Sequence, residues 1–228
     1  MGLDKEESFT IMESVRKGKG LRDEWVETML AHGVPEWYIG SCRKIKYMFP
    51  KAHAAAYVMM GWRVAWFKVH KPLAYYAAYF SIRASAFSYE IMCRGRAILE
   101  QYLNELTSMP KEQQTKKDQD TIRDGRIAQE MYARGFEFMP IDIYRAKARD
   151  CQIIDGKIMP PLSSVEGLGD KACEQVEEAA KPGPFTSLDN FREQAKVSKT
   201  NVDKMVELGI LTGLPESDQL SLADFLAV

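Results

Sequence analysis

An apolar segment that begins at Pro50 most constrains the fold of this chain. Proline is favoured in the first turn of a helix, because its ring presets φ and it has no N–H to leave unpaired. Good helix formers follow in His53-Ala-Ala-Ala-Tyr57, and Pro72 forces a break. The segment therefore predicts a helix that ends before Pro72, with a second apolar helix over 73–84.

Three side chains near the start of this helix have a chemistry that suits a nucleotide. Lys51 lies at the predicted helix start, where backbone N–H groups and the helix dipole attract anions. His53 and Tyr57 are four residues apart and share one helix face. A cation, an imidazole and a stackable phenol could hold a phosphate tail and a base. The alternative is ordinary core packing, with Trp62 and Trp66 as packing residues and His53 as a satisfied polar group.

The overall charge provides no general attraction to nucleic acid. The formal net charge is −1 at pH 7, so any binding must come from local patches. One patch follows a predicted helix over 4–17, and a further cation ends the predicted helix over 36–48. The cations that we assign to phosphate or nucleotide contact are Arg16, Lys17, Lys19 and Lys46. Clustered Lys and Arg bind phosphates without regard to sequence, and the alternative is a solvated charge run.

The remaining sequence predicts a mainly α fold with one short β-hairpin. Apolar residues recur at helical spacing, and the further predicted helices are 21–32, 86–107 and 121–135. Asp155-Gly156 between apolar residues is a hairpin signal, and Pro160-Pro161 marks a linker. We expect a helical domain over 1–150, a small domain over 151–216 and a tail over 217–228.

The small domain contains a segment, Ser164 to Val176, that resembles a helix-hairpin-helix. Gly167 and Gly169 flank Leu168, and the glycines allow a tight turn and close approach of a ligand. The N–H groups of such a turn and of the next helix point at an anion such as a DNA phosphate. Lys171 is the only close cation, and an ordinary connection between two helices is the alternative.

A degenerate second copy of this motif follows in the sequence. Lys196 and Lys199 flank Ser198, which is a plausible N-cap for the next helix. We expect these three residues to contact DNA. The glycines of the first copy are missing here, so the alternative is that the second copy only braces the first.

The final segment of the chain has three residues that could anchor it to a partner. Gln219, Leu222 and Phe225 are similar to the anchors of the short peptides by which bacterial DNA-acting enzymes dock to the sliding clamp. Leu222 and Phe225 would fall on one side of a single helical turn. The alternative is a helical turn packed on its own domain.

Other features restrict the class of protein. Four cysteines lie far apart and, with three histidines, offer no zinc-ligand spacing, so we expect reduced thiols in a cytoplasmic protein. The apolar run over 58–67 is interrupted by Arg63 and followed by Lys68, so no membrane span is expected. We assign no catalytic residue and no metal ligand to the chain.

Several of these motifs together resemble a known family. The run from Lys44 to Tyr57, Phe67-Lys68-Val69-His70, and the segment from Tyr75 to Phe80 closely resemble the fingers of bacterial replicative DNA polymerase III α subunits, especially the PolC type. The run from Ile11 to Gly20 is similar to the same family. The resemblance implies the C-terminal part of such an enzyme, with fingers over 1–150, a duplex-binding helix-hairpin-helix domain and a clamp-binding tail.

The resemblance also implies partners and roles. Lys51 would meet the triphosphate of an incoming dNTP, His53 the triphosphate or sugar, and Tyr57 the sugar or base. Primer–template DNA, the sliding clamp, and the palm and thumb of the polymerase would be partners, with magnesium held in the palm. The full-length protein would be a nucleotidyltransferase, and this chain alone would catalyse nothing. The alternatives are a non-catalytic helix-hairpin-helix scaffold and a shorter, DnaE-like α subunit.

Overall fold

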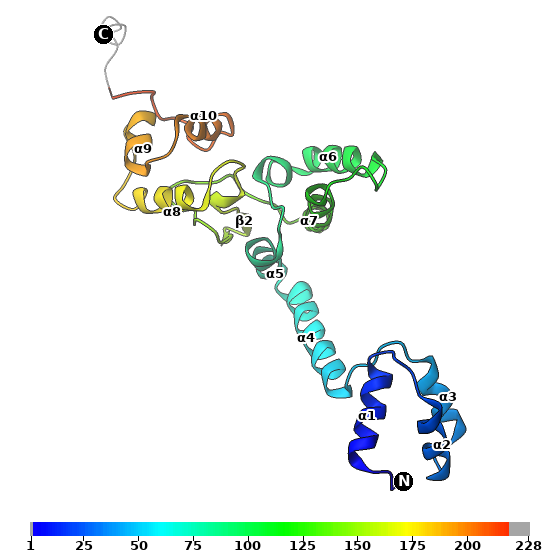
Figure 1. Ribbon diagram of the computed structural model, residues 1–228. Helices are drawn as coiled ribbons and strands as arrows, with labels where there is room; N and C mark the ends of the chain where they lie inside the picture. The colour runs from blue at the N-terminus through cyan, green and yellow to red at the C-terminus, as the bar shows by residue number, and fades with distance from the viewer. Residues whose placement is uncertain (1, 219–228) are drawn as a thin grey trace, which may run out of the picture. The chain divides into compact units, whose positions relative to one another are not determined.

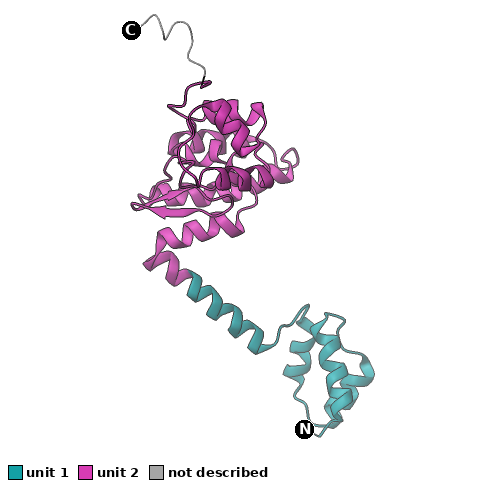
Figure 2. Cartoon of the chain, turned by 90° about the vertical axis from the view of Figure 1, so that its left-hand side faces the viewer, with its two compact units in different colours: residues 1–64 teal, residues 65–228 magenta. Residues whose placement is uncertain are grey.

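A computed structural model describes residues 2–218 and divides the chain into two compact units, residues 1–64 and 65–228 (Figure 2). The division falls within helix α4 (Lys51–His70), which begins directly after Pro50 as the sequence predicts. Each unit is described by itself. The predicted domain boundary between residues 150 and 151 stays a prediction.

The first unit is built from short helices around a small apolar core. Asp4 caps α1 by accepting hydrogen bonds from the backbone N–H groups of Glu6 and Glu7, both at 3.0 Å. The helices that precede α4 are α1 (Lys5–Arg16), α2 (Asp23–Ala31) and α3 (Glu36–Lys44). The core side chains are Ile11, Trp25, Met29, Val34 and Ile39. Helix α3 is shorter than the predicted 36–48 because Ile45 is already extended.

The second unit begins with a helical segment that contains two π-helical turns. Helix α5 (Pro72–Ala78) continues into the π-helix η1 (Tyr79–Arg83). A second π-helix, η2 (Tyr89–Cys93), precedes α6 (Arg96–Ser108). The single predicted helix over 86–107 was therefore wrong, because Gly95 has a φ of 114° and interrupts the helical backbone. π-Helical turns occur frequently near functional sites.

A buried carboxylate joins this segment to helix α7 (Lys116–Ala133). Asp124 of α7 is fully buried. Its Oδ1 accepts a hydrogen bond from the Tyr79 hydroxyl at 2.8 Å, and its Oδ2 accepts from the backbone N–H groups of Ser85 and Ala86 at 2.9 and 3.0 Å. Arg123 adds hydrogen bonds to both oxygens. Asp124 therefore fixes the loop between the two π-helices against α7.

The predicted β-hairpin is present. Strands β1 (Gln152–Ile154) and β2 (Lys157–Met159) pair antiparallel, with Ile153 opposite Ile158. The turn residues Asp155 and Gly156 both have positive φ, 49° and 75°, as a two-residue hairpin turn requires. Ile158 also exchanges backbone hydrogen bonds with residues 137 and 139, so the hairpin is joined to the chain after α7.

The chain after the hairpin is again helical, and the predicted mainly α class with a short β-hairpin is confirmed (Figure 1). Its elements are the 3₁₀-helix η3 (Leu162–Ser164), α8 (Asp170–Ala179), α9 (Leu188–Ala195) and α10 (Lys199–Glu207). Their apolar faces join one core with the earlier elements of the unit, from Tyr76 of α5 to Leu211 after α10. Over residues 2–218, no helix is long and apolar enough to cross a membrane.

Candidate nucleic-acid interface

The first hairpin has the geometry of a tight turn between η3 and α8. Gly167 has a φ of 89°, so a residue with a side chain would be strained there. Leu168 is buried in the core and anchors the turn, so its side chain is not available to a ligand. Gly169 is the N-cap of α8, with φ −69°, and a Cβ there would meet no atom within 4 Å. The fold itself therefore requires glycine at 167 and not at 169.

The second hairpin reproduces this backbone without glycines. Lys196 takes the left-handed conformation, with φ 52°, at the place of Gly167 in the first hairpin. The N-cap Ser198 has φ −69° and ψ 154°, close to the −69° and 159° of Gly169. As predicted, Ser198 caps α10, because its hydroxyl accepts a hydrogen bond from the Asn201 backbone N–H at 3.2 Å. The chain thus contains two hairpins of matching geometry.

The two hairpins differ in charge. Asp170 lies in the first turn of α8, and Lys171 follows it on the exposed surface. The first turn of α10 contains no acidic residue and begins with Lys199. Lys196 and Lys199 are both exposed. The second hairpin is therefore the more cationic of the two.

Glu90 of η2 connects both hairpins. Its Oε1 accepts a hydrogen bond from the Glu166 backbone N–H in the first hairpin at 3.1 Å. The same oxygen pairs with the ammonium group of Lys204 on α10 at 3.0 Å. The Glu166 carboxylate is in turn held by Lys117 of α7 at 2.9 Å. These contacts hold both hairpins on Glu90, and no local pattern in the sequence indicates them.

In the first unit, the predicted cations gather around one close backbone contact. A Cβ added to Gly18 would lie 2.1 Å from the carbonyl oxygen of Lys46, so the turn after α1 packs directly on residue 46. The Met48 backbone N–H donates a hydrogen bond to the Arg16 carbonyl oxygen at 3.2 Å. Arg16, Lys17, Lys19 and Lys46 thus lie on adjoining segments.

Part of this positive charge is already paired. Glu13 accepts contacts from Arg16 at 2.6 Å and from Lys17 at 2.9 Å. These two hydrogen-bonded cations lower the pKa of the Glu13 carboxyl to about 2, so it stays ionised at neutral pH. Lys19 and Lys46 are exposed. A phosphate would therefore meet a patch in which Glu13 offsets some of the charge.

The predicted nucleotide residues of α4 form part of an exposed aromatic row. The rings of Phe49 and His53 are stacked, with centroids 4.8 Å apart, and His53 is 4.5 Å from the ring of Tyr57. Lys51 is exposed at the first position of α4, and Tyr57 has 68% of its surface exposed. The side chains share one face as predicted, and ring faces of this kind are available for stacking.

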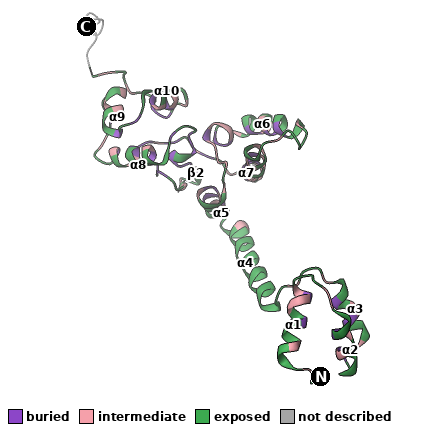
Figure 3. Cartoon of the chain, in the orientation of Figure 1, coloured by how far each residue is buried: buried purple, intermediate pink, exposed green. Residues whose placement is uncertain are grey.

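The alternative for α4, ordinary core packing, is not observed. Trp62 is 77% exposed and Trp66 is 51% exposed, although both were weighed as packing residues. Figure 3 shows that α4 is exposed along its length, and no residue of it is buried. The helix is apolar on every side, so its sequence did not indicate which face would be covered.

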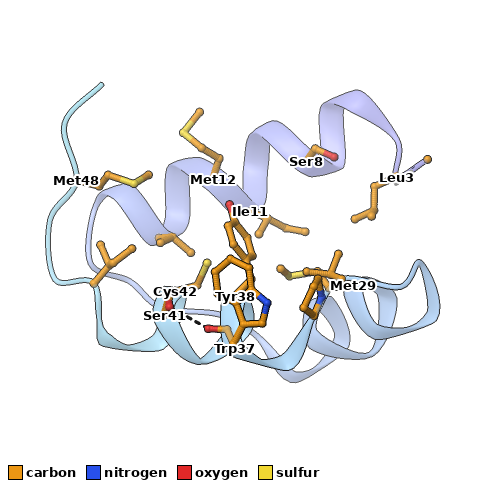
Figure 4. A pocket seen from close by; sticks show the side chains of 15 residues that line it. Leu3, Ser8, Ile11, Met12, Met29, Trp37, Tyr38, Ser41, Cys42 and Met48 are labelled. Atoms are coloured by element: carbon orange, nitrogen blue, oxygen red, sulfur yellow. Dashed lines mark hydrogen bonds between the residues drawn. The ribbon is translucent and has the colours of Figure 1, made fainter. Parts of the chain in front are cut away.

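The first unit also has an apolar pocket of about 590 Å³ between α1 and the α2–α3 pair (Figure 4). Trp37, Tyr38, Met12 and Met48 line it together with the buried thiol of Cys42. The lining contains no charged side chain. This pocket suits apolar groups and not a triphosphate, so it is separate from the predicted nucleotide residues.

One pair of closely spaced aspartates in the described chain has a structural role. An Asp-x-Asp pair, Asp118 and Asp120, lies in the first turns of α7. Asp118 forms a capping box with Thr115, and Asp120 pairs with Arg123 at 2.6 Å. Within residues 2–218, no three His, Cys, Asp or Glu side chains are grouped so that they could hold a metal ion.

The four cysteines have the character of inert thiols. All four are free, and Cys42, Cys93 and Cys173 are buried. Burial raises the pKa of Cys151 to about 12 and that of Cys173 to about 11. Thiols that ionise only at such high pH are poor nucleophiles at neutral pH.

The predicted clamp-binding residues Gln219, Leu222 and Phe225 lie outside the described residues.

The paired hairpins define the class of the second unit. Residues 135–220 match the helix-hairpin-helix motif family, in agreement with the geometry described above. This part of the second unit is therefore a helix-hairpin-helix module, a class of fold that points to DNA binding.

Comparison with curated proteins finds similarity over nearly the whole chain. The chain is 44% identical over 221 residues to DNA polymerase III PolC-type of Oceanobacillus iheyensis, and 47% identical over 222 residues to that of Listeria monocytogenes. It is 45% identical over 230 residues to the protein of the same name from Streptococcus pneumoniae. These matches cover 97–98% of this chain and 15–16% of the length of the relatives. Over nearly its whole length, the chain is therefore similar to a segment that makes up 15–16% of PolC-type DNA polymerase III proteins.

Proposed function

We propose that this chain is the part of a bacterial DNA-directed DNA polymerase that holds the incoming dNTP, the primer–template duplex and the sliding clamp. The observation that carries the proposal is the match of 97% of the chain, at 44–47% identity, to proteins named DNA polymerase III PolC-type. The reaction would take place in the cytoplasm and would use magnesium held in the palm of the full-length enzyme. The chain alone would add no nucleotide.

The duplex would be gripped at the two hairpins. The first N–H groups of α8 and α10 have no carbonyl partner within their helices, and the loops before them leave Gly169 and Ser198 at the surface. Backbone N–H groups of this kind bind phosphate oxygens without reading bases. Lys171, Lys196 and Lys199 are the adjacent exposed cations. Binding would therefore be independent of sequence.

The dNTP would be held at the start of α4. Lys51 supplies a cation at the helix N-terminus, where the dipole also favours an anion. His53 and Tyr57 supply a hydrogen-bonding ring and a stacking face within one aromatic row. The cations Arg16, Lys17, Lys19 and Lys46 lie on the two segments joined at Gly18 and would add long-range attraction to the triphosphate.

The clamp would be bound by the tail. Gln219 offers an amide for the rim of a pocket, and Leu222 and Phe225 offer apolar side chains for its interior. Burying two such side chains stabilises a complex by roughly 3–6 kcal/mol, and ordering of the peptide offsets much of this. Micromolar binding is sufficient, because both partners are held on one DNA at high effective concentration.

The hairpin assignment is tested by fluorescence anisotropy with a labelled duplex. Gly169→Val is the most informative variant, because the fold has open space and an ordinary φ at this residue. The variant should leave the melting temperature nearly unchanged. Its side chain should keep a phosphate from the N–H groups at the start of α8 and weaken duplex binding by about tenfold, the effect of one lost charge-assisted hydrogen bond. Lys171→Glu should also weaken binding, and Lys181→Glu, an exposed control after α8, should weaken it less. Unchanged affinity in Gly169→Val would refute the assignment.

The clamp assignment is tested by deletion of residues 219–228 in the polymerase assembled with its remaining segments. Nucleotide addition on short primers should be unaffected, and stimulation by the clamp should be lost. A truncated polymerase that still responds fully to the clamp would show that the docking site lies elsewhere.

A further inference from the structure

A small polar cavity lies in the second unit, beside the first hairpin. Its volume is about 190 Å³. The loop between η1 and η2 lines one side, and η3 with the segment before β1 lines the other. The lining residues with polar side chains are Ser81, Ser85, Arg149, Ser163 and Ser164. The remaining lining residues are Phe80, Ala84, Phe87 and Pro161, so no carboxylate lines the cavity.

The hydroxyl groups of the cavity have different roles. Ser81 Oγ donates to the Ala77 carbonyl oxygen at 2.7 Å, and Ser164 Oγ donates to the Pro161 carbonyl oxygen at 2.6 Å, so these two groups build the wall. Ser85 Oγ accepts a hydrogen bond from Arg123 Nη2 at 2.8 Å, which leaves its own O–H available as a donor. Ser163 is exposed and presents a second hydroxyl.

The cavity also has a cation that can exchange partners. Arg149 Nη2 contacts Glu174 at 2.8 Å and Asp170 at 3.4 Å, and all three side chains are more than half exposed. Ion pairs at such exposed sites contribute little, about 0–1 kcal/mol. The guanidinium has five N–H donors in a fixed fork, so it can face the cavity while it keeps one acidic neighbour. Glu174 and Asp170 would oppose an anion and limit its affinity.

We propose that this cavity is a binding site for a phosphate group. Two available hydroxyl donors and a guanidinium match the acceptor oxygens of a phosphate, and Arg is the side chain best suited to bidentate phosphate contact. The guanidinium disfavours a metal cation, and the polar walls disfavour an apolar ligand. The phosphate group could belong to a polynucleotide strand or to a free phosphate. This proposal stands on the cavity and does not depend on DNA binding by the hairpins.

The test is a titration of the full chain followed by ¹H–¹⁵N NMR, with inorganic phosphate in one arm and a short single-stranded oligonucleotide in the other. Saturable shifts should centre on the amide signals of Ser85, Ser163 and Arg149. Arg149→Gln should weaken binding by at least about tenfold, because it removes the charged partner of the phosphate. Glu174→Gln, which frees Arg149 from its nearer carboxylate, should strengthen binding several-fold.

The controls separate binding from folding. Ser163→Ala changes an exposed hydroxyl and should weaken binding with no loss of thermal stability. Arg192→Gln removes another half-exposed arginine, paired with Asp189, and should leave the titration unchanged. Saturation in the oligonucleotide arm alone would assign the site to a polynucleotide strand, and saturation by inorganic phosphate would extend it to free phosphate. Absence of shifts in both arms, or equal affinity of Arg149→Gln and the wild type, would overturn the proposal.

Discussion

The substitution Asp124→Asn should severely destabilise the second unit. The fully buried carboxylate accepts hydrogen bonds from the Tyr79 hydroxyl, from the backbone N–H groups of Ser85 and Ala86, and from Arg123. An asparagine has one acceptor oxygen, and its NH₂ group would face donors on the other side. The variant therefore leaves at least one set of buried donors without an acceptor and Arg123 without its buried counter-charge.

The expected magnitude follows from these contacts. A buried donor without an acceptor costs about 1–3 kcal/mol, and an amide NH₂ in place of Oδ2 would leave two such donors, the backbone N–H groups of Ser85 and Ala86. We expect the free energy of unfolding to fall by about 3–5 kcal/mol. At about 2–4 °C per kcal/mol for a domain of this size, the melting temperature should fall by roughly 6–20 °C. The assay is urea denaturation and thermal unfolding followed by circular dichroism.

Asp120→Asn is the matched control, because Asp120 pairs with the same arginine at the surface. It should cost less than about 1 kcal/mol. A loss of less than about 1 kcal/mol in Asp124→Asn would refute the reasoning, since it would show that the buried hydrogen bonds contribute no more than the exposed ion pair.

The pH dependence gives a second test of the same residue. Burial opposes ionisation of Asp124, but the hydrogen bonds from Arg123, Ala86, Tyr79 and Ser85 outweigh it and hold the pKa of the carboxyl below its ordinary value. A lowered pKa in the folded state contributes stability above the unfolded pKa of about 3.9, and this stability is lost as the pH falls through the folded pKa. The stability difference between wild type and Asp124→Asn should therefore shrink below about pH 4. A difference that grows on acidification would contradict the assignment.

Two further predictions concern the first unit. Gly18→Ala should destabilise it by roughly 1–3 kcal/mol in urea denaturation, because the added Cβ would lie 2.1 Å from the Lys46 carbonyl oxygen. Gly20→Ala is the control, because Gly20 has a similar φ and open space around it, and it should cost less. Equal losses of stability in the two variants would contradict the close contact at Gly18. His53→Ala and Tyr57→Ala should change stability by less than about 0.5 kcal/mol, as expected for exposed residues. In the polymerase assembled with its remaining segments, both should raise the KM for dNTP or lower kcat, and unchanged kinetics with a large loss of stability would show that they are core residues.

Local signals in the sequence were sufficient for most helices, the β-hairpin and the first helix-hairpin-helix. Pro50 starts α4, and Asp155-Gly156 forms the predicted turn. The predicted helix over 86–107 was wrong because its apolar spacing continues across Gly95, whose φ of 114° only the folded structure reveals. Periodicity reports which residues share a face, and it does not report a break that tertiary packing favours.

The features that sequence reasoning missed depend on contacts between distant segments. Asp124 lies on the buried stripe of α7 with Thr121 and Ala128, and a carboxylate on such a stripe is a signal that could have been used. Its partners near Ser85 could not be predicted, since nothing local links them. Lys196 was predicted as a DNA contact, but its left-handed backbone was not, because a lysine is not expected in the conformation that Gly167 adopts easily.

The most direct test of the central claim is the salt dependence of duplex binding by the full chain. Fluorescence anisotropy at several salt concentrations should give a linear fall of log affinity with log salt, equal for unrelated duplex sequences. Replacing both Lys196 and Lys199 by Gln should lower the steepness by about two, and Lys171→Gln by about one, because each lost phosphate contact lowers it by about one. An affinity that does not change with salt, that selects one sequence, or that keeps its full salt dependence in these variants would contradict the account.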